Sequence, residues 1–121
     1  MKKKYKKVYS LAHQAGYRNY TVRDLLELKG RKKLTQINVI TPGEAAAAEL
    51  ADIDLLITGA DRLKQIRAAA PNTFLTCGIK YTEHESKESI ARKCFELIEL
   101  GVDSIHTNSW NMNFIKYISE F

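Results

Sequence analysis

From residue 34 onward, the apolar positions repeat with two alternating spacings, first that of a strand and then that of a helix. Residues at helical spacing predict helices over 42–50, 61–70, 86–100 and 111–121. Alternating or β-branched stretches predict strands over 34–40, 53–58, 73–79 and 103–107. Strands that are joined through helices run parallel with right-handed crossovers, so the pattern predicts four consecutive βα units.

The predicted helices are flanked by residues that favour the start or the end of a helix. Thr41 is followed by Pro42 and, at the third helical position, by Glu44, a combination that begins a helix. Gly101 follows the helix predicted over 86–100. In the same way, Thr21 and Gly30 enclose a short helix over 22–29.

The first 33 residues follow a different pattern. Tyr5, Val8, Tyr9, Leu11 and Ala12 are at helical spacing, which predicts a helix over 3–15. We therefore divide the chain into a basic N-terminal helical arm, 1–33, and a (βα)4 domain, 34–121.

Four βα units are half of the eight that close a TIM barrel, so the predicted fold is an α/β half-barrel. Its first and last strands would have open edges, and we expect a homodimer or tetramer that completes the eight-stranded barrel. A doubly wound four-stranded sheet is the alternative. It is disfavoured because no strand is a continuous run of Val, Ile and Leu.

Composition and charge narrow the range of partners. The chain is 45% hydrophobic and 27% charged, and no apolar run approaches the roughly 18–20 residues that span a bilayer, so we expect a cytoplasmic protein without membrane contact. Residues 1–33 have eleven Lys and Arg against two acidic residues, net +9, whereas the remainder has eight against twelve, net −4. A basic arm with tyrosines can contact nucleic-acid phosphates. A solvated charged face is the simpler interpretation, so a nucleic-acid partner is not expected.

Cys77 and Cys94 are the two cysteines of the chain. No CxxC or Cys/His spacing suggests zinc, and two cysteines do not form a disulfide scaffold. We expect reduced, buried thiols and no metal site.

Three stretches resemble a known family: TVRDLLELKGRKKLTQINVITPGEAAAAELADIDLLITGADR, AAAPNTFLTCGIKYTE and LIELGVDSIHTNS. They are similar to the first half of ketopantoate hydroxymethyltransferase and to phosphoenolpyruvate mutase/isocitrate lyase-like proteins. The resemblance runs from Tyr20 to Glu120 and implies a TIM barrel with metal-dependent aldol or lyase chemistry. The family's acidic and basic site positions correspond here to Ala60, Gly78, His106 and Asn108, so bound magnesium is not expected.

TIM-barrel active sites form at the carboxyl ends of the strands. The candidate catalytic residues there are Asp61, Lys80, Tyr81 and His106, which resemble the Asp/Tyr/Lys/His tetrad of aldo-keto reductases in type and strand position. In such a set a tyrosine hydroxyl near an ammonium protonates a carbonyl oxygen as hydride arrives, while a histidine orients the carbonyl. Candidate cofactor contacts, for NADPH or NADH, are Thr58, Gly59 and Asn108.

Each of these residues also has a purely structural interpretation. Asp61 can cap the helix that follows it, Lys80 can be a solvated loop residue, and His106 can be a satisfied polar residue of the interior. The functional hypothesis is an enzyme that converts a small carbonyl compound, a 2-oxoaldehyde or 2-oxo acid, by NAD(P)H-dependent reduction. The alternatives are the family's aldol or lyase chemistry, or a non-enzymatic oligomeric metabolite-binding module.

Overall fold

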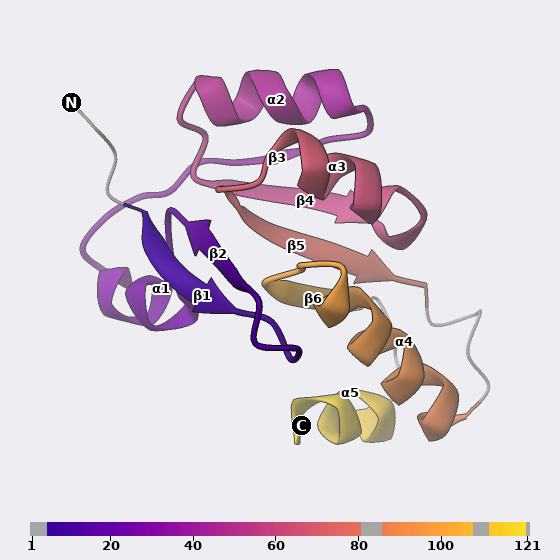
Figure 1. The fold of residues 1–121 in the computed structure, drawn as a ribbon. Helices are drawn as coiled ribbons and strands as arrows, with labels where there is room; N and C mark the ends of the chain where they lie inside the picture. The colour runs from indigo at the N-terminus through magenta and orange to yellow at the C-terminus, as the bar shows by residue number, and fades with distance from the viewer. Residues whose placement is uncertain (1–4, 81–85, 108–111, 121) are drawn as a thin grey trace.

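The computed structural model describes residues 5–80, 86–107 and 112–120, and it has an α/β fold (Figure 1). Four parallel strands lie side by side in chain order: β3 (Gln36–Asn38), β4 (Leu55–Gly59), β5 (Phe74–Ile79) and β6 (Ser104–Thr107). The intervening helices are α2 (Pro42–Leu50), α3 (Leu63–Ala69) and α4 (Lys87–Glu99), and α5 (Met112–Ser119) follows β6. The predicted alternation of strands and helices is confirmed.

The hydrophobic core lies between one face of this sheet and the helices. Leu56 of β4 and Leu75 and Cys77 of β5 are fully buried on that face, since side chains two apart along a strand share a face. Ala45 of α2, Ile66 of α3 and several residues of α4 belong to the same cluster. Each fully buried Leu or Ile contributes on the order of 1.5–3 kcal/mol, so this single layer is the main source of stability.

The opposite face of the sheet is not covered by any of the connecting helices α2, α3 and α4. Right-handed crossovers between strands in the order β3-β4-β5-β6 place each of these helices on the same side. The residues on this face alternate with the core residues along the strands and are more exposed than the core residues: Asn38, Ile57, Gly78 and His106. A doubly wound sheet requires a reversal of strand order, and this sheet has none, so the alternative fold is not formed.

The N-terminal helix predicted over 3–15 is wrong. The chain forms an antiparallel hairpin of β1 (Lys6–Tyr9) and β2 (Ala15–Arg18), which pair from Lys6 with Arg18 to Tyr9 with Ala15. In the turn, the Ser10 hydroxyl accepts hydrogen bonds from the backbone of Ala12 and Gln14, and His13 has a left-handed φ of 60°. This turn chemistry, with β-favouring Val and Tyr in the strands, outweighs a short helical periodicity that has little stability by itself.

The hairpin and α1 (Val22–Leu28) lie at the amino ends of the parallel strands, opposite the arrowheads of β4 and β5 (Figure 1). Asn19 connects them to the sheet, because its side-chain amide donates to the Asp54 carbonyl and its side-chain oxygen accepts from the Phe74 N–H, each at 2.8 Å. The Tyr20 hydroxyl donates to the Asp54 carboxylate at 2.9 Å. Burial raises the pKa of Asp54, but hydrogen bonds from Thr35 and Tyr20 and the Lys32 charge outweigh burial and lower it.

A buried charge network, consisting of Arg18, Arg67 and Asp103, joins the hairpin to the amino end of β6. Arg18 Nε donates to Asp103 Oδ1 and Arg67 Nη1 to Asp103 Oδ2, both at 3.0 Å, and the three side chains are only 10%, 11% and 13% exposed. Burial and the Arg18 charge lower the pKa of Arg67 to about 10, against the opposing effect of Asp103. Arg67 is still protonated at neutral pH, so two guanidinium groups share one carboxylate.

The local helix signals are confirmed at both ends of α1. The Thr21 hydroxyl accepts from the Asp24 N–H at 3.2 Å, and the Asp24 carboxylate accepts from the Thr21 N–H at 2.8 Å. Gly30 and Gly101 follow α1 and α4 with φ of 77° and 98°, left-handed values that favour glycine. Thr41 caps α2 as predicted.

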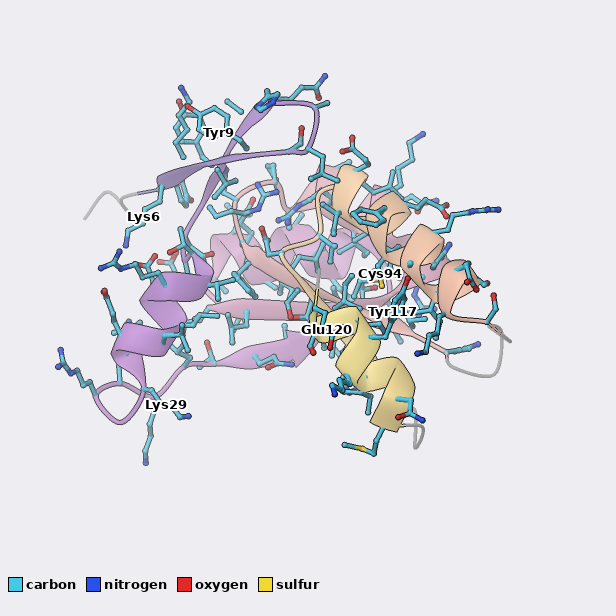
Figure 2. All side chains as sticks on the ribbon, turned by 90° about the horizontal axis from the view of Figure 1, so that it is seen from below. Lys6, Tyr9, Lys29, Cys94, Tyr117 and Glu120 are labelled. Carbon is cyan, nitrogen blue, oxygen red and sulfur yellow. The ribbon has the colours of Figure 1, made fainter. Side chains whose placement is uncertain are left out.

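The last helix, α5, packs on α4. Lys87 Nζ of α4 lies 5.4 Å from the centre of the Tyr117 ring, a cation–π contact, and Figure 2 shows Tyr117 on the side of α5 that faces α4. Ile118 reaches the core cluster. Within the residues that the structure describes, no helix combines the length and the apolar character needed to cross a membrane.

Candidate functional site

A cleft of about 510 Å³ opens at the carboxyl ends of the four parallel strands. This is where βα proteins place their sites, because the loops that follow the strands converge there. Its volume is in the range of small-molecule sites. The polar and charged side chains that line it are Asn38, Thr58, Asp61, Arg62, Lys80 and His106.

Three of the four predicted catalytic residues lie in this cleft. Asp61 is in η1 (Ala60–Arg62), a single 3₁₀ turn after β4, Lys80 directly follows β5, and His106 is on β6; all three are exposed. Tyr81 lies outside the described residues, as does the predicted cofactor contact Asn108. The described part of the site is therefore a carboxylate, an ammonium and an imidazole at the ends of three adjacent strands.

Glycine at position 78 leaves open the space beside the histidine. Gly78 pairs with His106 across the sheet. A methyl group placed on Gly78 would lie 3.9 Å from His106 Nδ1 and 3.8 Å from the Thr58 carbonyl oxygen, which are ordinary contact distances. A small side chain at this position would fit the fold and would occupy part of the cleft.

The two predicted cofactor contacts on β4, Thr58 and Gly59, have different surroundings. The Thr58 side chain is buried, and its hydroxyl donates to the Val39 carbonyl at 2.9 Å, so it is used within the fold. Gly59 lies beneath two charged groups: a Cβ there would be 2.9 Å from Asp61 Oδ1 and 3.3 Å from Arg62 Nη2. The absence of a side chain at Gly59 is what lets both charges lie over the strand end.

Arg62 is the cleft residue that sequence reasoning missed. Its side chain is half-buried, and its Nε is fully buried with no hydrogen-bond acceptor among the described residues. The signal for it in the sequence is a cation directly after Asp61, at the end of a strand.

Comparison of the chain with known proteins finds no match among family models, curated proteins or solved structures. The family resemblance inferred from the sequence therefore stays a prediction. The described residues also contain no group of three His, Cys, Asp or Glu side chains that could hold a metal ion. The function of the chain is accordingly inferred from the geometry of its cleft.

The two cysteines lie on the core side of the sheet, away from the open face. Cys77 is fully buried on β5, and Cys94 is buried on α4 (Figure 2). Burial raises the pKa of the Cys77 thiol to about 11 and also raises that of Cys94. Neither thiol is a nucleophile at neutral pH, because the reactive form is the thiolate.

We expect the folded protein to resist a thiol reagent such as dithiobisnitrobenzoate at pH 8 and to release two equivalents of thionitrobenzoate once unfolded in guanidinium chloride. The physical reason is the combination of burial and a raised pKa, which leaves little accessible thiolate. Rapid modification of native protein, at the rate of free cysteine, would contradict the burial. A Cys94→Ser variant assigns any slow reaction to one of the two positions.

Proposed function

We propose that this protein binds and converts a small carbonyl compound, a 2-oxo acid or 2-oxoaldehyde, in the cleft at the strand ends. The observation that carries the proposal is the convergence of Asp61, Lys80 and His106 on one cleft of suitable volume. An ammonium and an imidazole can donate hydrogen bonds to a carbonyl oxygen and stabilise the negative charge that develops there. Asp61 supplies a carboxylate to the same cleft.

We further propose that the working form is an assembly in which a second copy completes the barrel. Among the described residues, β3 and β6 are the outer strands of the sheet and each pairs on one side only, and the connecting helices α2, α3 and α4 cover one face. Pairing β6 of each copy with β3 of the other closes eight parallel strands with two-fold symmetry. The cleft would then lie at the mouth of the closed barrel, the position of TIM-barrel active sites.

Reduction by NADPH or NADH is the chemistry to test first, although the described residues of one copy do not form a dinucleotide site. The Thr58 hydroxyl is used within the fold, and no glycine-rich phosphate loop follows the strands. Among the described residues that line the cleft, Arg62 and Lys80 are the cationic groups. The residues present thus fit a small carbonyl compound, and any contacts with the rest of a dinucleotide would have to come from other residues.

We expect Lys80→Ala and His106→Ala each to lower the turnover of a carbonyl substrate by at least about a hundredfold, because each removes a group that stabilises the developing charge. Consumption of NADPH and of NADH with methylglyoxal, pyruvate and other simple 2-oxo acids measures this. Lys64→Ala, an exposed lysine of α3 outside the cleft, is the matched control and should leave turnover unchanged. Unchanged turnover in both cleft variants would remove the reductase proposal.

The second candidate is a metabolite-binding module without catalysis. It is favoured by the same cleft, whose polar groups are sufficient to orient a ligand. Binding and turnover measurements distinguish the two proposals. Saturable binding of a 2-oxo acid would establish the module if no turnover occurs in the presence of either nicotinamide cofactor. Aldol or lyase activity would appear as product formation that needs no nicotinamide cofactor.

A further inference from the structure

We infer that Arg62 is the group that binds the carboxylate of the ligand, and that the preferred ligand is consequently a 2-oxo acid and not a neutral 2-oxoaldehyde. This inference rests on the proposed function, because it uses the same cleft, and it names the substrate class. Three arginines among the described residues are at least part-buried, and they differ in their partners. Arg18 and Arg67 have a carboxylate partner, whereas Arg62, in the cleft, has none among the described residues.

Arg18 and Arg67 show how this fold pairs buried guanidinium groups, although the Arg67 Nε, like the Arg62 Nε, has no hydrogen-bond partner among the described residues. Both donate to the Asp103 carboxylate at 3.0 Å, and both also donate to the Gly101 carbonyl. A buried guanidinium with neither partner would lose several kcal/mol of hydration free energy without compensation. The amino ends of the strands therefore carry cations with an internal counter-ion.

Arg62 lies at the carboxyl ends of the strands, and its surroundings differ from those of Arg18 and Arg67. It is half-buried, its Nε is covered, and no ion pair or hydrogen bond to it is found among the residues that the structure describes. Asp61 reaches the same point above Gly59 without forming an ion pair with it. A guanidinium of this kind is stabilised by an anion that enters the cleft, and its planar array of donors matches a carboxylate.

The position of Arg62 gives a consistent orientation for a 2-oxo acid. Arg62 Nη2 lies near the end of β4, while Lys80 and His106 are at the ends of β5 and β6 in the same cleft. With its carboxylate on Arg62, a short 2-oxo acid extends across the sheet toward these two groups. Its carbonyl oxygen then lies on the side of the cleft where Gly78 leaves space beside His106.

The experiment measures binding separately from turnover, by NMR titration of the isotope-labelled full-length protein with pyruvate and with its neutral analogue pyruvamide. We expect pyruvate to bind at least about tenfold more tightly than pyruvamide, as a charge-assisted hydrogen bond implies. Arg62→Gln should remove this difference by weakening pyruvate alone. Arg62→Lys should restore part of it, because an ammonium keeps the charge and loses the bidentate geometry.

Variants at two neighbouring positions serve as matched controls, and we expect them to change the affinity for pyruvate in opposite directions. Asp61→Asn removes a negative charge beside the guanidinium and should tighten pyruvate binding, whereas a merely structural Asp61 would not alter it. Gly78→Ala narrows the cleft and should weaken pyruvate and pyruvamide by similar factors. Thermal melts establish that each variant is folded before its affinity is compared.

The outcomes separate this inference from the proposed function. Arg62-dependent preference for pyruvate without turnover supports the carboxylate site and overturns the proposed catalysis. Turnover of a carbonyl compound with equal affinities for pyruvate and pyruvamide, or a preference that survives Arg62→Gln, overturns the inference and leaves the proposed function standing. Tighter binding of inorganic phosphate than of any 2-oxo acid also overturns it, because the site would then be one for phosphate.

Discussion

Replacing Asp103 with asparagine is expected to lower the free energy of unfolding by about 3–5 kcal/mol, the usual cost of removing one member of a buried ion pair. The substitution keeps the shape of the side chain and removes the charge that Arg18 and Arg67 share. Two guanidinium groups that are 10% and 11% exposed would then repel each other without the carboxylate that pairs with both. Since a domain of this size has roughly 5–15 kcal/mol in total, the expected loss is a large fraction of its stability.

Urea unfolding followed by far-ultraviolet circular dichroism measures this loss. Glu99→Gln is the matched control: it removes an exposed carboxylate in the last turn of α4 and should change stability by no more than about 0.5 kcal/mol. If Asp103→Asn is too unstable to purify, limited proteolysis of freshly made protein gives the same ranking. An unfolding midpoint equal to that of the native protein would show that the network does not hold the hairpin to the sheet.

Light scattering at micromolar concentration is expected to give about twice the chain mass of 13.8 kDa, or a higher even multiple. The reason is that β3 and β6 each pair on one side only within the described part of the chain, and the backbone N–H and C=O groups of such an edge favour pairing with another strand. Because the connecting helices α2, α3 and α4 lie on one face of the sheet, Leu55 and Ile57 are half-buried on the other. A stable monomer would remove the half-barrel proposal and favour an open sheet.

The geometry of β3 identifies a substitution that tests the edge itself. The Val39 N–H donates to Ile57, and Thr35 accepts from the Leu55 N–H, so odd-numbered positions bond to β4. By the alternation of a parallel ladder, the N–H of Gln36 is directed to the open edge. Gln36→Pro removes this donor without removing a bond to β4, and we expect it to produce monomers.

Gln36→Thr is the control for this substitution, because it changes the same exposed side chain and keeps the edge N–H. It should assemble like the native protein. Thermal melts at low concentration, where both variants are dissociated, would show whether proline damages the single copy. Assembly of the proline variant with unchanged mass would show that the copies associate through another surface.

The sequence by itself determined the succession of strands and helices in the last two thirds of the chain. Periodicity, β-branching and the caps at Thr21 and Thr41 are local properties, read within a few residues. Parallel pairing in chain order, with helices on one face, then follows from the handedness of crossovers. The placement of Asp61, Lys80 and His106 at one edge followed from the same argument and needed no knowledge of side-chain contacts.

Only the tertiary structure decided the form of the N-terminus and the charge environment of the site. The segment 6–18 is a hairpin, and the side chain that ends it, Arg18, binds a carboxylate 85 positions away. Similarly, the exposure of Arg62 to the cleft depends on how Gly59 ends its strand and on where Asp61 lies. The first contact joins residues that are distant in sequence, and the second depends on the direction of neighbouring side chains. Local periodicity contains no information about long-range contacts or about side-chain direction.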